Sequence, residues 1–236
     1  SLREEIVKAV VGQRDAVDQV LVALLAAGHV LIEGVPGLGK TLLARALGKS
    51  LALQVARVQF TPDLMPSDIT GHAVLDTNTR GEGNALGTLR VLRGPVFTNL
   101  LVADEINRAP AKTQAALLEV MQEAQVTLEG QTLVLSKPFM VMATQNPLET
   151  EGTYPLPEAQ LDRFLLKIEI GYPPHDEETA IVVRSTEGQA GDQLPLDGVT
   201  QRVEERHVIT LQNMAAAVRV DDKVIDYAVR ITRATR

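Results

Sequence analysis

The sequence contains no cysteine and no tryptophan, and aromatic residues make up only 3% of its 236 residues. Without cysteine, the chain can form no disulfide, thiol nucleophile or thiolate metal site. With so few aromatic side chains, it also has few surfaces on which unpaired bases could stack. These absences exclude thiol chemistry and disfavour a protein that binds single-stranded nucleic acid.

An excess of positive charge and a long apolar run are also missing. Acidic residues number 30 and basic residues 23, which leaves a net charge of −7. Nucleic-acid binders draw most of their affinity from phosphate contacts, so nucleic acid is not the expected partner, although a basic pore could still form in an oligomer. The longest apolar stretches, such as Val20–Ala27, are far shorter than the ~20 residues that span a bilayer. With Glu4 and Glu5 near its start and no apolar signal core, we expect a cytoplasmic protein with no membrane span.

Short apolar runs alternate with helical segments along the first 170 residues. The apolar runs predict five strands, at 30–33, 55–60, 99–103, 139–144 and 164–170. Helical spacing of apolar residues predicts helices at 2–10, 14–27, 41–51 and 109–122. Strands that alternate with helices are typical of a parallel sheet covered by helices. The sequence therefore predicts an α/β fold, in a chain long enough for one sizeable domain and a small appendage.

Two segments interrupt this alternation, at 74–97 and 125–135. Both combine alternating apolar residues with glycine, as in the Glu129-Gly130 pair, and this pattern predicts β-hairpins inserted into the α/β core. Their polar tips need not pack against the core, so we expect both hairpins to be interaction surfaces.

A domain boundary is expected at Tyr172-Pro173-Pro174, because the two prolines stop the preceding strand. This divides the chain into an α/β core at 1–171 and a helical unit at 172–236. Helices are predicted at 176–187, 211–218 and 221–236. The second unit is small, and its last helix reaches Arg236 without a stop signal, so we expect it to be incomplete.

The strongest motif is Gly34-Val35-Pro36-Gly37-Leu38-Gly39-Lys40-Thr41, which matches the phosphate-binding loop pattern G-x-x-x-x-G-K-[ST] in full. It follows a predicted strand and opens a predicted helix, which is the context that the motif needs. Lys40 would place its charge on the β- and γ-phosphates, and Thr41 would offer a hydroxyl to Mg²⁺. The alternative is a glycine-rich turn with an exposed lysine, which this context disfavours.

A second candidate group is the pair Asp104-Glu105, which ends the apolar run Leu100–Ala103. A strand buried on both faces is uniformly apolar and delivers polar side chains at the carboxyl edge of its sheet. Asp104 would hold Mg²⁺, and Glu105 would polarise the attacking water. Alone, such a pair could be a helix cap or a surface acid, but beside a phosphate loop the catalytic interpretation is favoured.

The roles of two further residues cannot be decided from their chemistry alone. Asn146, after the fourth strand, could reach the γ-phosphate or form a turn before Pro147. Arg163, just before the fifth strand, could pair with Asp162 at the surface or complete the site of a neighbouring subunit. The four histidines show no metal-ligand spacing, so we expect no histidine metal site.

Several sequence motifs taken together resemble those of the MoxR family of AAA+ ATPases. The resemblance runs from Val11-Gly12-Gln13 through nearly the whole chain. The two most distinctive strings are Asp-Glu-Ile-Asn-Arg and Glu-Ala-Gln-Leu-Asp-Arg-Phe. The matching segments are 34–41, 104–110, 114–119, 143–147 and 151–164.

The resemblance implies an αβα AAA+ core with a parallel five-stranded sheet, two β-hairpin inserts and an α-helical lid from about Tyr172. It implies that Asn146 is the sensor 1 residue, that Arg163 is an arginine finger, and that Val11 and Gly12 pack on adenine. ATP with Mg²⁺ would be held by Thr41 and Asp104 at the metal and by loop residues at the phosphates. Those loop residues are Gly34, Pro36, Gly37, Leu38, Gly39, Lys40, Thr41 and Leu42.

The resemblance also implies a homo-oligomeric ring, expected to be a hexamer, that matures or remodels client proteins with a von Willebrand factor A domain partner. In one respect the sequence departs from the family: the lid should continue to a sensor 2 arginine, and Arg236 falls in a helix that should precede it. Three alternatives remain at this point. They are a magnesium-chelatase-type ATPase subunit, a DNA-remodelling ATPase, and a nucleotide switch that does not hydrolyse, although Lys40 and Glu105 give no sign of an inactive site.

Overall fold

A computed structural model describes the chain except residues 36, 77–87, 149–151, 187–195, 197 and 236. Its helices are α1 Leu2–Ala9, α2 Arg14–Leu25, α3 Lys40–Leu51, α4 Pro66–Thr70, the 3-10 turn η1 Ile106–Arg108, α5 Ala111–Glu123, α6 Glu158–Leu161, α7 His175–Thr186, α8 Glu205–Ala216 and α9 Asp222–Ala234. Its strands are β1 Val30–Glu33, β2 Val55–Gln59, β3 Gly71–Asp76, β4 Thr88–Arg93, β5 Leu100–Asp104, β6 Gln125–Leu128, β7 Gln131–Val134, β8 Met140–Gln145 and β9 Leu166–Glu169.

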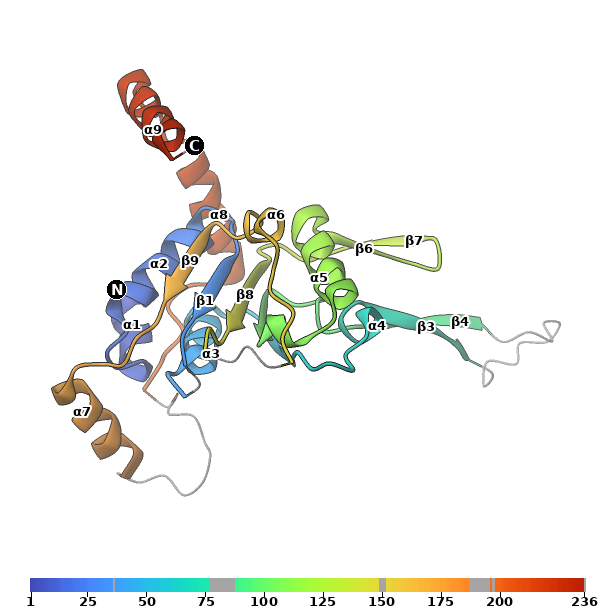
Figure 1. The fold of residues 1–236 in the computed structure, drawn as a ribbon, viewed down its shortest axis with the longest axis horizontal. Helices are drawn as coiled ribbons and strands as arrows, with labels where there is room; N and C mark the ends of the chain where they lie inside the picture. Colours follow the sequence, from blue (N-terminus) through green and yellow to red (C-terminus); the bar gives the residue numbers. More distant parts are fainter. Residues whose placement is uncertain (36, 77–87, 149–151, 187–195, 197, 236) are drawn as a thin grey trace.

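The centre of the molecule is a parallel five-stranded sheet in the order β2-β5-β8-β1-β9 (Figure 1). This confirms the predicted sheet, with each strand within about two residues of its expected position. Every residue of β5 is buried, as the uniformly apolar run Leu100–Ala103 predicts. All five strands therefore end at one edge, and the loops that follow them meet there.

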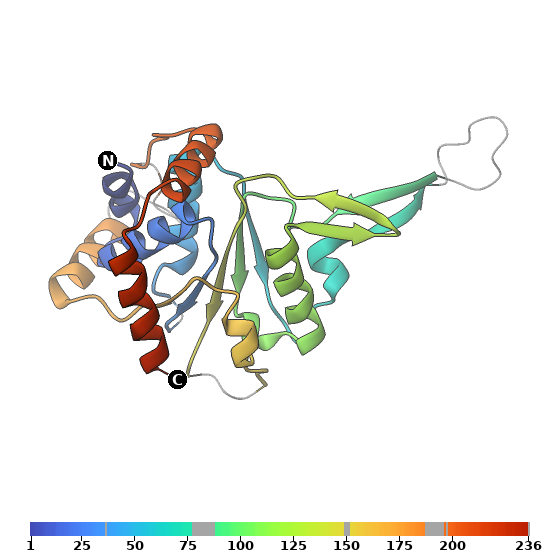
Figure 2. The ribbon, with the colours of Figure 1, turned by 90° about the horizontal axis from the view of Figure 1, so that it is seen from above.

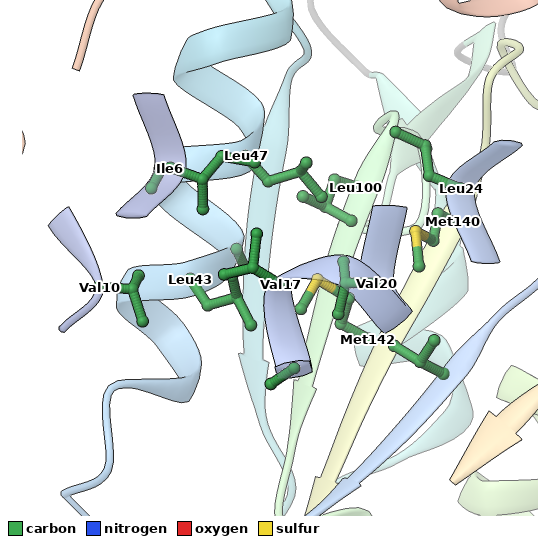
Figure 3. Packing of buried hydrophobic residues seen from close by; sticks show 14 of the residues in the cluster. Ile6, Val10, Val17, Val20, Leu24, Leu43, Leu47, Leu100, Met140 and Met142 are labelled. Carbon is green, nitrogen blue, oxygen red and sulfur yellow. The ribbon is translucent and has the colours of Figure 1, made fainter. Parts of the chain in front are cut away.

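Two apolar layers cover the sheet, one on each face. Alternate residues of β5 and β8 face opposite sides: Leu100 and Met140 join the cluster formed with α1, α2 and α3, and Leu101 joins the cluster formed with α5. Figure 3 shows the first layer, where residues of α1, α2 and α3 interlock above the strands. The period of two along buried strands thus produces the αβα sandwich.

Both predicted insertions are antiparallel hairpins. The first is formed by β3 and β4 and begins three residues before the expected position, with its tip at 77–87 outside the described residues. The second is formed by β6 and β7 around Glu129-Gly130. Both project from the same side of the molecule (Figures 1 and 2). Interaction through these hairpins remains a prediction.

The structure corrects the predicted helices in three places. The short helices α4 and α6 were not expected, since each is only one turn with little apolar spacing. Helix α8 begins at Glu205, not at residue 211. The prediction missed this start because the first three residues, Glu205, Arg206 and His207, are polar and exposed. Helix α8 packs against α2, where the Gln212 side chain donates to the Leu24 carbonyl at 2.7 Å.

Candidate active site

The phosphate-binding loop lies between β1 and α3 at the carboxyl edge of the sheet. Gly37 and Gly39 have positive φ angles of 86° and 77°, and a Cβ on either would project into open space. The backbone conformation, and not crowding, therefore requires glycine at these two positions. Helix α3 begins at Lys40 without a side-chain cap, so its first N–H groups are oriented to bind an anion.

Lys40 is folded back onto its own loop. Its Nζ donates to the carbonyl oxygens of Gly34 at 2.6 Å and Val35 at 3.4 Å. Burial lowers the pKa of this ammonium, while the charges of Asp104 and Glu105 oppose that shift. A partly desolvated cation whose hydrogen-bond partners among the described residues are carbonyls gains a stronger partner when a phosphate enters.

Asp104, at the end of β5, is the most highly connected side chain of the site. Its Oδ1 accepts from the Thr144 hydroxyl at 2.6 Å. Its Oδ2 accepts from the Thr41 hydroxyl at 3.3 Å and from Nε and Nη2 of Arg57, each at 2.8 Å. Four elements, α3, β2, β5 and β8, are thereby joined at one carboxylate.

Glu105 adopts a left-handed backbone conformation with φ of 55°, which is uncommon for a residue other than glycine. Its N–H donates to the Thr144 hydroxyl at 3.0 Å. Its Oε2 accepts from the Gln59 side chain at 2.9 Å and pairs with Arg108 Nε at 3.0 Å. The turn therefore directs the two acidic side chains to different partners.

Asn146 forms the turn that was one of its two interpretations, and its contact with a γ-phosphate remains a prediction. Its Oδ1 accepts from the Leu148 N–H at 3.1 Å, which forms the turn around Pro147. The same residue is buried and lines the cleft beside Thr144. The turn orients the side chain, so its structural role and a role toward phosphate are compatible.

These residues enclose a polar cleft of about 400 Å³, lined by Gly37, Gly39, Lys40, Thr41, Leu42, Arg57, Gln59, Asp104, Glu105, Thr144 and Asn146. A hydroxyl, a carboxylate and a nearby ammonium suit a magnesium–nucleotide complex, in which phosphates supply part of the metal's oxygen shell. Within the described residues, no three His, Asp or Glu side chains are gathered as a metal cage. A metal that is shared with phosphate needs no such cage.

Several predicted residues lie outside this cleft. Val11 and Gly12 are placed against the start of the helical unit, and a Cβ on Gly12 would meet Pro173 and Glu177 at 2.7 Å. Gly34 packs against the Ile170 carbonyl, where a Cβ would approach to 2.6 Å. Leu38 packs on the core, and Pro36 lies outside the described residues.

Arg163 lies at the opposite edge of the sheet. It precedes β9, whose Leu166 pairs in parallel with Val30 at the start of β1, and the Leu165 N–H donates to the His29 carbonyl at 2.8 Å. The phosphate loop follows the end of β1. A four-residue strand covers about 13 Å, so Arg163 is separated from the cleft by the length of the sheet.

Four site residues were not predicted from the sequence: Arg57, Gln59, Thr144 and Arg108. A signal was present for the first two, because Arg57 and Gln59 are polar residues two apart on a strand and so share one face. Thr144 gave no such signal, since a threonine is ordinary in a strand.

Residues 29–166 match the model of the ATPase family associated with various cellular activities, abbreviated AAA. The chain therefore belongs to this family of nucleotide-binding ATPases. Within the family it is of the MoxR type, as the relatives show: it is 46% identical to chaperone MoxR1 of Mycobacterium tuberculosis over 98% of this chain and 58% of that protein. It spans less than two thirds of that chaperone's length.

Two other comparisons cover nearly the whole chain. Protein YeaC of Bacillus subtilis is 46% identical over 99% of this chain and 69% of its own length. The crystal structure of a Cytophaga hutchinsonii protein, 41% identical, superposes with a TM-score of 0.86 over all of this chain and 68% of that one. Among the residues that the structure describes, no helix is both long and apolar enough to cross a membrane.

Proposed function

We propose that the chain is the catalytic part of a Mg²⁺-dependent ATPase that matures or remodels client proteins. The observation that carries the proposal is the convergence of Lys40, Thr41, Asp104 and Glu105 on one cleft. Lys40 and Thr41 begin α3, and Asp104 and Glu105 stand at the end of β5. Together they provide the cation, hydroxyl and carboxylates that phosphoryl transfer to water requires.

Each side chain has a distinct role in this proposal. Lys40 leaves the loop carbonyls for the β- and γ-phosphates, and Thr41 with Asp104 holds Mg²⁺, which supplies charge neutralisation at the phosphates. Glu105 polarises the attacking water, and Asn146 orients it or contacts the γ-phosphate.

The base of the nucleotide is assigned to the border between the core and the helical unit. Val11 and Gly12 lie there, close to Pro173 and Glu177, and the Gln13 side chain donates to the Gly171 carbonyl at 3.1 Å. An adenine at this border would contact both units, so ATP binding would bias their relative position. The loop residues Gly34, Pro36, Leu38 and Leu42 complete the proposed nucleotide site.

The proposed setting of this activity is a homo-oligomeric ring, most simply a hexamer, that works with a von Willebrand factor A domain protein on a client. The support is the similarity to a protein named as a chaperone, MoxR1. A strong rise in ATPase rate on adding a purified von Willebrand factor A domain protein, with no response to DNA, is the expected result. Stimulation by DNA alone would favour the DNA-remodelling alternative.

The catalytic assignment is tested with Glu105→Gln. This variant keeps Asp104, Thr41 and Lys40, so we expect ATP binding to remain while turnover falls by about 10² to 10⁴-fold, the usual contribution of a general base. Binding is followed with a fluorescent ATP analogue and turnover by phosphate release, and Glu123→Gln at the exposed end of α5 is the matched control. Turnover at the parental rate would remove Glu105 from this role.

A further inference from the structure

Arg57 places a positive charge on the carboxylate assigned to the metal. Its Nε and Nη2 both lie 2.8 Å from Asp104 Oδ2, the oxygen that also accepts from Thr41. The other oxygen of Asp104 is bonded to Thr144. The guanidinium therefore occupies the side of Asp104 that faces the phosphate loop, which is where the proposed function needs the metal.

A guanidinium and a divalent cation cannot share this oxygen without strong repulsion, because their charges would lie within a few ångströms of each other in a partly buried cleft. Arg57 is able to move: its side chain is 47% exposed, whereas that of Asp104 is 10% exposed. It also lines the same cleft as Lys40 and Thr41, so the guanidinium can turn away from Asp104 toward solvent.

The same guanidinium is connected to the catalytic carboxylate. Arg57 Nη2 donates to Gln59 Oε1 at 2.9 Å, and Gln59 Nε2 donates to Glu105 Oε2 at 2.9 Å. A chain of hydrogen bonds therefore runs from Asp104 through two side chains of β2 to Glu105. A displacement of Arg57 from Asp104 changes the position of Gln59 and so the restraint on Glu105.

We propose that Arg57 is a built-in counter-cation that neutralises Asp104 when no metal is bound and competes with Mg²⁺ for it. The inference rests on the proposed function, since it takes Asp104 as the metal carboxylate. Arg57 thereby weakens the dependence of nucleotide binding on Mg²⁺. It also keeps Asp104 and Glu105 in one hydrogen-bonded arrangement until the metal–nucleotide complex enters.

The test compares nucleotide affinity with and without the metal, using a fluorescent ADP analogue so that no hydrolysis occurs. In Arg57→Gln, Asp104 keeps an unneutralised charge near the phosphates, so binding in EDTA weakens. With Mg²⁺ there is no guanidinium to displace, so binding strengthens. The ratio of the affinity with Mg²⁺ to the affinity in EDTA is expected to rise about tenfold or more over the same ratio in the parental chain. Arg57→Lys keeps the charge but loses the two-nitrogen contact, so its ratio should lie between those of the parental chain and Arg57→Gln.

The matched control is Arg206→Gln, which removes an exposed arginine that pairs with Glu204 at 2.8 Å on α8. Its metal dependence should equal that of the parental chain. If Arg57→Gln weakens both affinities by the same factor, Arg57 only supports the structure, and the inference is wrong. A fall in the ratio overturns it as well, because Arg57 would then assist the metal complex. Failure of the parental chain to bind Mg²⁺–ADP at all would instead remove the proposed function.

A second measurement uses the parental chain itself and does not depend on the folding of Arg57→Gln. The Nε–H group of Arg57 should give a slowly exchanging ¹⁵N NMR signal, identified by its loss in Arg57→Lys. Addition of ADP in EDTA should leave that signal in place, and addition of Mg²⁺ should abolish it. A signal that persists in the Mg²⁺–ADP complex would show that Arg57 stays on Asp104 and would overturn the inference.

Discussion

At the scale of single residues, Lys40 illustrates how the site is prepared for an anion. Its ammonium is partly buried and bonded to the carbonyls of Gly34 and Val35, two neutral partners in its own loop. Burial lowers the pKa of this group, and a phosphate would reverse that effect by supplying a negative charge. The lysine is therefore held near the cleft by contacts that are weaker than those a nucleotide would provide.

Replacement of Lys40 by alanine is expected to weaken ATP-analogue binding by about 10 to 100-fold, the range of a lost hydrogen bond to a charged group. Fluorescence titration measures the change. Lys49→Ala is the control, because Lys49 lies on the same helix and donates to the Leu196 carbonyl at 2.8 Å, away from the cleft. Equal affinities in all three proteins would show that Lys40 does not contact the phosphates.

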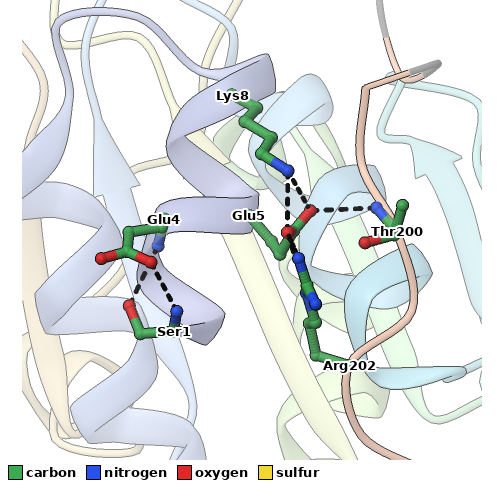
Figure 4. A network of polar contacts seen from close by, with 6 residues as sticks. All are labelled: Ser1, Glu4, Glu5, Lys8, Thr200 and Arg202. Carbon is green, nitrogen blue, oxygen red and sulfur yellow. Dashed lines mark hydrogen bonds and ion pairs between the residues drawn. The ribbon is translucent and has the colours of Figure 1, made fainter.

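At the scale of secondary-structure elements, a buried carboxylate joins the first helix to a distant segment of the chain. Glu5 of α1 is 2% exposed, and it accepts from Lys8 at 2.8 Å, from the Thr200 N–H at 3.1 Å and from Arg202 (Figure 4). The N–H groups of Arg202 and Val203 also donate to the Ser50 carbonyl. The segment that leads into α8 is therefore fastened to both α1 and α3.

These contacts make stability depend on pH in a defined direction. The hydrogen bonds from Lys8, Arg202 and Thr200 hold the pKa of Glu5 far below its usual range. A depressed pKa stabilises the fold above the unfolded pKa of about 4.3, and that contribution is lost as the pH falls toward the folded pKa. Glu5→Gln should therefore lower the melting temperature at pH 7. The gap, which is the difference in melting temperature between this variant and the parental protein, should narrow below about pH 4.3.

Thermal unfolding from pH 7 down to pH 3 measures this gap. The control is Asp18→Asn, which breaks the exposed pair between Arg3 and Asp18 at 2.7 Å and should change the melting temperature little. A gap that is the same at every pH would mean that the charge of Glu5 is irrelevant and that only its packing matters.

At the scale of the whole molecule, the position of Arg163 indicates how subunits would cooperate. The parallel register of β1 and β9 places Arg163 at the amino edge of the sheet, whereas Lys40 and Glu105 lie at the carboxyl edge. A side chain at one edge cannot reach a nucleotide at the other edge of its own subunit. Arg163 is exposed, so it is available to the site of a neighbour, as the proposed ring requires.

We therefore expect Arg163→Ala to bind ATP normally but to lose turnover by about 10³-fold or more, the usual effect of an arginine finger supplied in trans. Mixing this variant with Glu105→Gln should restore part of the activity, because one interface in the mixed ring would combine an intact Arg163 with an intact Glu105. The assay is done on full-length protein by phosphate release at several mixing ratios. Activity that never recovers and does not depend on protein concentration would leave Arg163 as a surface charge.

Local patterns in the sequence were sufficient to predict the sheet and the core of the site. A uniformly apolar run such as Leu100–Ala103 can be satisfied only by burial on both faces, and the pair that follows must then emerge at the sheet edge. The phosphate loop is equally local, since its glycines and Lys40 act within one strand–turn–helix unit. These features need no knowledge of which strands are neighbours.

The contacts between strands were decided by the tertiary structure alone. Arg57 and Thr144 bond to Asp104 only because β5 lies between β2 and β8. The register places Thr144 directly after Ala143, the partner of Ala103, and places Arg57 opposite Val102, from where its long side chain reaches Asp104 two residues further on. Their separations from Asp104, 47 and 40 residues, carry no record of that order. The start of α8 was hidden for a related reason: its first three residues are polar, and the helix is held by the buried Val208 and by packing on α2. A sequence determines what each segment can bury, whereas the neighbours of a polar side chain depend on how the whole sheet is assembled.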